Sequence, residues 1–136
     1  MEELRPLVAF LPVFEKRGFK AGKIVASGPD ARGIYEEPYP RYHEAVDAFL
    51  SAAHGAGLVR GDFDWPRWAR TEEAERLFED RDAIAEATAD DLTKMLTVCI
   101  RRERFSEGSM LGAFKSGLIV RILRRAAELL DAKPTA

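Results

Sequence analysis

Residues 95–110, MLTVCIRRERFSEGSM, lie where one predicted helix ends and the next begins, and this stretch indicates a mainly helical fold. The stretch begins on an apolar helix face and runs directly into the charged residues 101–104. Phe105 follows, and residues 106–109 are typical of a turn that begins a new helix. We therefore expect charges of both signs, an aromatic ring and a helix N-terminus close together.

Helices are predicted on both sides of this stretch. Residues 88–91 have the form of a capping box with Asp in place of Glu. The apolar residues that follow at helical intervals are Leu92, Met95, Leu96, Cys99 and Ile100. After the stretch, Ser106 or Ser109 begins a helix that ends at Gly117, and residues 118–130 form a last helix with a wide apolar face.

Three more helices are predicted in the first half of the chain. Residues 4–14 have an amphipathic pattern, although Pro12 should kink or shorten this helix because proline has no N–H. Residues 45–53 form a second helix. A third begins after Asp64, a candidate N-cap, with Pro66 in its first turn.

The only predicted β structure lies in a segment rich in Gly and Pro. Residues 23–26 and Ile34–Tyr35 are interpreted as two short strands joined by a turn at residues 27–30. The fold class is therefore mainly α, a compact bundle of five or six helices with at most a short β-hairpin near residues 23–36. The length predicts a single helical domain over residues 1–136.

Composition and charge limit the class of protein. Hydrophobic residues at 46% and charged residues at 32% are typical of a soluble globular domain. A single cysteine and the absence of a signal peptide or an apolar run of about 20 residues favour a cytoplasmic protein with no membrane partner. Residues 62–90 carry 4 basic and 10 acidic side chains, and residues 91–136 carry 9 basic and 5 acidic. These parts are expected to pack together and cancel, or else to display a basic face to an anionic partner.

The candidate site lies where the long central helix ends. Its members are Arg101, Glu103, Arg104, Phe105, Glu107 and Gly108. Glu103 and Arg104 follow Ile100 by three and four residues, so both are expected near the buried face, where a charge must be paired. One hypothesis is an internal ion-pair network with the acidic middle of the chain. The other is an anion site, with Arg104 and the N–H groups after Ser106 as donors.

No metal, cofactor or catalytic residue is predicted. His43 and His54 share a helix stripe but lie about 16 Å apart along the axis, too far to bind one ion. Cys99 lies on an apolar stripe, where thiols are inert. The helix–Gly117–helix arrangement with its C-terminal arginines could suggest a DNA reader, but the turn has no recognisable motif and the sequence pI is 5.8. Nucleic acid is therefore not expected as the main partner.

The segment MLTVCIRRERFSEG resembles the signature of an uncharacterised bacterial family of small domains of unknown function. The matching residues are Leu96-Thr97, Cys99-Ile100-Arg101, Glu103-Arg104-Phe105 and Glu107-Gly108. The resemblance covers residues 35–131 and includes Tyr39–Tyr42, Phe63–Trp65 and Gly117. Many members carry His and an aromatic residue where this chain has Ser109 and Met110, so chemistry that needs that His is not implied here. The resemblance supports the location of the candidate site and implies no activity.

The sequence favours a non-enzymatic interaction domain that binds a protein partner, because every common catalytic signature is missing. One alternative is a ligand-binding or enzymatic domain with a polar pocket at Glu103, Arg104 and Glu107. A second is nucleic-acid binding through the basic C-terminal helices. The sequence leaves a homodimer open.

Overall fold

The computed structural model describes residues 1–26, 28–34 and 37–132. Its strands are β1 (Gly22–Val25) and β2 (Tyr39–Tyr42). Its helices are the 3-10 turn η1 (Glu2–Leu4), α1 (Arg5–Val8), α2 (Leu11–Phe14), α3 (Glu44–Gly55), α4 (Trp65–Trp68), α5 (Glu72–Glu79), α6 (Arg81–Ile84), α7 (Ala89–Arg102), α8 (Ser109–Lys115) and α9 (Leu118–Asp131). The predicted fold class, mainly helical with a short hairpin, is confirmed.

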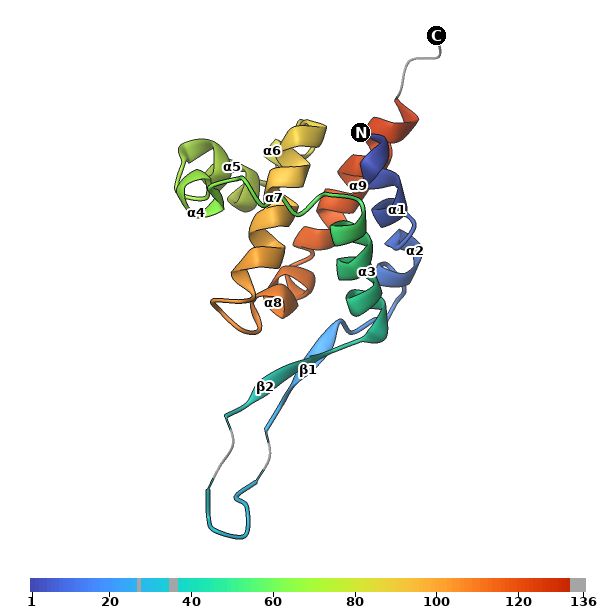
Figure 1. Cartoon of the computed structure of the whole chain (residues 1–136). Helices are drawn as coiled ribbons and strands as arrows, with labels where there is room; N and C mark the ends of the chain where they lie inside the picture. The colour runs from blue at the N-terminus through green and yellow to red at the C-terminus, as the bar shows by residue number, and fades with distance from the viewer. Residues whose placement is uncertain (27, 35–36, 133–136) are drawn as a thin grey trace.

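Helices α7 and α9 lie against each other at the centre of the helical body. Helices α1 and α2 pack on α9, and α4 and α5 pack on α7 (Figure 1). The largest fully buried side chains are Phe49, Leu4, Leu7, Leu92, Met95, Leu96, Met110, Ile119, Ile122, Leu123, Val46 and Val98. Each long helix thus buries the apolar stripe that its sequence periodicity predicts.

The start of α7 confirms the predicted capping box. The Asp91 N–H donates to Thr88 Oγ1 at 3.1 Å, and the Thr88 N–H donates to Asp91 Oδ2 at 3.0 Å. Both bonds satisfy donors that have no partner inside the helix. The cap therefore fixes where α7 begins. Because α7 leads directly into the candidate segment, the cap also helps to set the position of that segment.

Two predicted helices are divided in the structure. The helix expected over residues 4–14 is broken between α1 and α2, because Pro12 has no N–H to donate to the carbonyl of Val8. The helix expected after Asp64 becomes α4, α5 and α6, since Thr71 caps a new helix by accepting from the Ala74 N–H at 3.2 Å.

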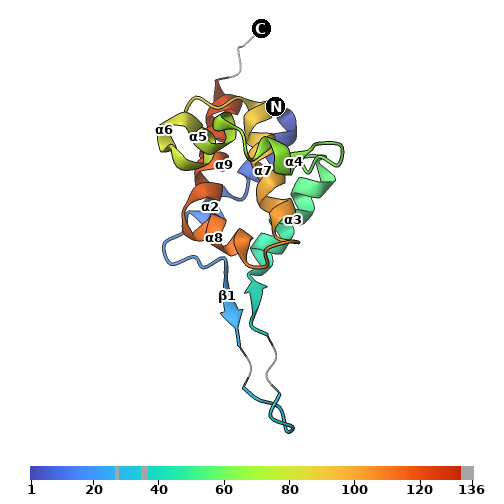
Figure 2. The same cartoon turned by 90° about the vertical axis from the view of Figure 1, so that its left-hand side faces the viewer.

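The hairpin does not have its predicted second strand. Strand β1 overlaps residues 23–26, but its partner is Tyr39–Tyr42, which pairs antiparallel with Gly22 opposite Tyr42 and Val25 opposite Tyr39. Ile34 is not in a strand, and Tyr35 lies outside the described residues. The strands project away from the helical body (Figures 1 and 2).

Pro40 explains why β2 was hard to predict. Proline is confined to strand positions whose N–H is not needed for pairing. The His43 N–H donates to the Ala21 carbonyl at 2.7 Å. Because hydrogen-bonded and non-bonded pairs alternate along an antiparallel ladder, Pro40 falls at a non-bonded position that faces the outer edge.

No helix among residues 1–26, 28–34 and 37–132 has the length and apolar character needed to cross a membrane.

Candidate functional site

The Glu103 side chain is the centre of the candidate segment. Its Oε2 accepts hydrogen bonds from the Tyr42 hydroxyl at 2.8 Å and from the Gly108 N–H at 3.0 Å. Its Oε1 accepts from the Met110 N–H at 2.9 Å, with the Ser109 hydroxyl at 3.5 Å. Since these donors belong to β2 and to the start of α8, one carboxylate at the end of α7 joins three elements.

Helix α8 needs this carboxylate because its own N-cap residue cannot supply an acceptor. That residue is Gly108, which has a left-handed backbone with φ of +95° and no side chain. The first turn of a helix has N–H groups without internal partners and favours negative charge. Glu103 therefore acts as the cap of α8 from outside the helix.

The Tyr42 hydroxyl extends the same network. It donates to Glu103 and accepts from the Leu111 N–H at 3.2 Å. Burial and, next, the hydrogen bond to Glu103 raise the pKa of Tyr42 above its ordinary value of 10. The phenol therefore keeps its proton at neutral pH and remains a donor.

This geometry changes the interpretation of the segment. Glu103 is held by hydrogen-bond donors rather than by the ion pairs proposed from the sequence, and within the described ranges neither Arg101 nor Arg104 forms a salt bridge. A carboxylate whose two oxygens both accept from the protein is poorly placed to act as a base or to hold a ligand. Through these bonds Glu103 links the hairpin, the end of α7 and the start of α8.

Of the other predicted site residues, Gly108 bonds to Glu103, while Arg101, Arg104, Phe105 and Glu107 lie around this junction without converging on it. Arg101 is half-buried, and Arg104, Phe105 and Glu107 are exposed. A cavity of about 240 Å³ is lined by His54, Val59, Ile100, Arg101, Arg104 and Phe105. Among the cavities found in the described structure, none brings Glu103, Arg104 and Glu107 together.

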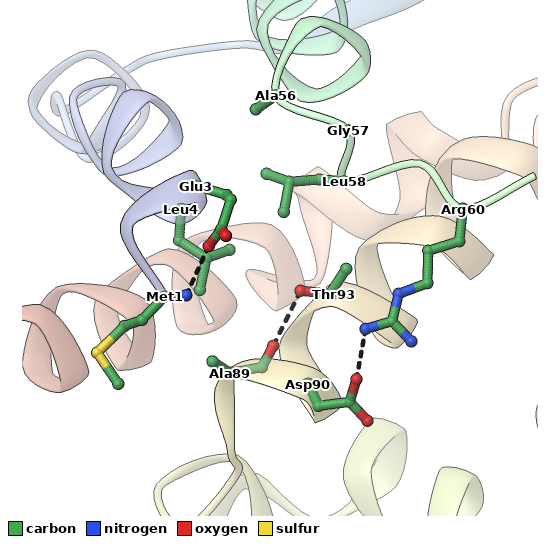
Figure 3. Close-up of a pocket in the computed structure, with 10 residues that line it drawn as sticks. All are labelled: Met1, Glu3, Leu4, Ala56, Gly57, Leu58, Arg60, Ala89, Asp90 and Thr93. Carbon is green, nitrogen blue, oxygen red and sulfur yellow. Dashed lines mark hydrogen bonds and ion pairs between the residues drawn. The ribbon is translucent and has the colours of Figure 1, made fainter.

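A second cavity, of about 310 Å³, lies where the N-terminus meets the start of α7 (Figure 3). Its charged groups pair with one another: the N-terminal ammonium lies 2.5 Å from Glu3, and the Arg60 guanidinium bonds to Asp90. The hydrogen bond from Arg60 holds the pKa of Asp90 below its ordinary value. The Thr93 hydroxyl donates to the Ala89 carbonyl at 2.9 Å. Because these charged and hydroxyl groups already have partners, the cavity offers few free groups to bind a charged ligand.

The largest cavity described, about 480 Å³, is a groove along β1. Its lining consists of Phe14, Phe19, Lys20, Ala21, Gly22, Lys23, Ile24, Leu111, Phe114, Lys115 and Val120. Three lysines and no acidic residue line it, and no residue of β2 does. Sequence reasoning missed this groove because Lys115 of α8 is far along the chain from Lys20 and Lys23, and no sequence pattern relates them.

The C-terminal arginines are used inside the fold and do not form a free basic stripe. Arg124 pairs with Glu15 at 2.6 Å, and Arg125 donates to the Ala87 carbonyl at 2.9 Å. Arg121 donates to a carbonyl of the α8–α9 turn at 2.9 Å. These contacts hold α9 to its neighbours, so the guanidinium groups of these arginines already have partners within the protein.

The cysteine and the histidines also have structural surroundings. Cys99 is buried, and burial raises the pKa of its thiol to about 12. His43 caps α3, with Nδ1 accepting from the Ala45 N–H at 2.9 Å. In the described part of the chain, no group of three His, Cys, Asp or Glu side chains is placed to hold a metal.

A model of a family of unknown function (DUF6508) matches residues 1–132. No curated protein and no solved structure matches the chain. The matched family is one of unknown function, like the family that the sequence resembles.

Proposed function

The chain belongs to the family of unknown function DUF6508. From its surface, we propose that it is a non-enzymatic domain that binds a protein partner through the β1–β2 hairpin. The observation that carries this proposal is where the exposed apolar side chains lie. Six large apolar side chains are exposed in the described residues, and three of them, Ile24, Ile34 and Tyr39 (53%, 55% and 37% exposed), belong to the projecting hairpin segment. The other three, Met1, Val13 and Phe105, lie in separate parts of the helical body. Single exposed apolar residues are ordinary, whereas a group on one projecting element indicates an interaction surface.

The base of the hairpin is held in a way that suits binding. A two-stranded hairpin is marginally stable alone in water. Here Tyr42 bonds to Glu103 and to the Leu111 N–H, so the root of the hairpin is fixed to the helical body. A binding element that is already ordered loses less conformational entropy when a partner docks.

The alternatives have less support. A catalytic pocket would need Glu103 free and close to Arg104 and Glu107, but Glu103 is occupied by donors of the protein. Nucleic-acid binding through the C-terminal helices would need several cations displayed there, while Arg124 and Arg125 are engaged with Glu15 and the Ala87 carbonyl.

The proposal is tested by capture from an extract of the native host with the full chain as bait. The hairpin variant Ile24→Asp/Tyr39→Asp is compared with the wild type and with Val13→Asp, since Val13 is similarly exposed at 40% but belongs to α2. We expect quantitative mass spectrometry to show specific proteins lost with the hairpin variant and retained with the control. Identical captured sets for all three folded baits would refute the proposal.

A further inference from the structure

The two edges of the hairpin differ in their ability to accept another strand. The bond from the His43 N–H to the Ala21 carbonyl fixes the alternation of the ladder. With the observed register, the N–H and C=O groups of Gly22 and Ile24 point away from β2, along the free edge of β1. At the outer edge of β2, Pro40 has no N–H. Strand addition is therefore favoured at β1.

The groove lies beside this free edge. Gly22, Lys23 and Ile24 of β1 line it together with residues of α8 and α9, while β2 contributes none. Ile24 shares the body-facing side of the hairpin with Tyr42, and a Cβ at Gly108 would lie 3.9 Å from Ile24 Cδ1. The side of the groove toward the body is apolar, with Phe114 half-buried within it.

The charge at the groove is entirely positive. Lys20, Lys23 and Lys115 are exposed, and within the described ranges none of them forms a salt bridge. Lys23 also stands directly opposite Arg41 in the ladder. Like charges directly opposite each other destabilise a strand pair, so bound carboxylates would relieve a repulsion that the free protein carries.

We propose that the groove binds an extended peptide with alternating apolar and acidic side chains, which adds to β1 as a third strand. Backbone groups of Gly22 and Ile24 supply the hydrogen bonds. Peptide side chains beside Ile24 face the apolar wall, and those beside Lys23 place carboxylates near its ammonium group. This inference rests on the proposed function and names the chemistry of the partner.

The first test uses a labelled peptide of alternating valine and aspartate and the full-length protein. Fluorescence anisotropy should show saturable binding below about 1 mM peptide. Two further peptides carry N-methyl groups on alternate backbone nitrogens, one in each phase. Because only one phase of amides can face β1, one methylated peptide should bind and the other should not. Equal binding of the two would overturn strand addition, and so would the absence of binding by the parent peptide.

Variants test the edge and the charge separately. Ile24→Pro removes the outward N–H but leaves the ladder with β2, and it should weaken binding at least about tenfold relative to Ile24→Ala, which keeps the N–H. Lys23→Glu should weaken binding about three- to tenfold, whereas Lys16→Glu, outside the groove, should not. Circular dichroism establishes that each variant is folded. Equal affinities within either pair would overturn that part of the proposal.

The outcomes also separate this inference from the proposed function. Host proteins lost with Ile24→Asp/Tyr39→Asp, together with no binding of the peptide, would leave the hairpin as an interaction surface and remove the acidic strand as its ligand. Self-association that Ile24→Pro abolishes, measured by light scattering, would replace the peptide with a second copy of this chain.

Discussion

Replacing Glu103 by alanine should destabilise the protein more than the substitution of a half-buried side chain usually does. The change leaves the Tyr42 hydroxyl and the N–H groups of Gly108 and Met110 without their acceptor. Loss of a helix cap costs about 1 kcal/mol, and a hydrogen bond to a charged group contributes about 1.5–3 kcal/mol when buried. Water reaches part of this junction and replaces some of the lost bonding, so we expect a total loss of about 2–3 kcal/mol in the free energy of unfolding.

Urea unfolding followed by circular dichroism measures this loss. With a denaturant slope of about 2 kcal/mol/M, the midpoint should fall by about 1 M. The matched control is Glu107→Ala, an exposed carboxylate in the same segment, which should change stability by less than about 0.5 kcal/mol. If Glu103→Ala behaved like its control, Glu103 would not be the attachment of the hairpin. A double-mutant cycle with Tyr42→Phe should give a coupling of about 0.5–2 kcal/mol, because the two side chains share a hydrogen bond.

Three other outcomes follow from the structure. Burial raises the pKa of the Cys99 thiol to about 12, so a thiol reagent should label the folded protein far more slowly than the unfolded protein, and rapid stoichiometric labelling would contradict this. The hydrogen bond from Arg60 lowers the pKa of Asp90 below 3.8. The stability that ionised Asp90 adds to the folded state is therefore fully present above pH 3.8 and is lost as the pH falls through the lowered pKa. The thermal midpoints of wild type and Asp90→Asn should therefore differ at pH 7, and the difference should shrink as the pH falls below 3.8. Anisotropy with a labelled DNA duplex should show only weak, salt-sensitive binding, and submicromolar binding at physiological salt that Arg124→Glu abolishes would refute this.

The parts of the fold that depend on local sequence were predictable. The capping box at Thr88, the N-cap at Asp64 and the turn at Gly117 each follow from neighbouring residues, and all three are present. The break in the first helix also follows from local sequence, because proline at position 12 predicts a kink or a shorter helix, and the structure has two short helices there.

The parts that depend on distant residues were not predictable. Tyr42 and Glu103 are 61 positions apart, and no spacing rule relates a strand residue to the cap of a helix that far away. The same holds for the groove, whose Lys23 and Lys115 meet only in the folded chain. Within the candidate segment, Glu103 bonds to the nearby Gly108 and Met110 N–H groups, but its partner Tyr42 comes from far outside the segment.

The attachment of the hairpin has a consequence for the motions of α8. The amide protons of Gly108, Met110 and Leu111 are bonded to Glu103 and Tyr42 rather than to other turns of the helix. Exchange of the Leu111 amide with deuterium therefore reports detachment of Tyr42 and the hairpin, whereas the Gly108 and Met110 amides report release of the Glu103 cap. Both openings should cost less free energy than global unfolding. A ligand that tightens the hairpin against the body would slow exchange at Leu111 and leave the centre of α7 unchanged. Magnetic resonance can therefore follow the attachment of the hairpin and the capping of α8 as two separate motions.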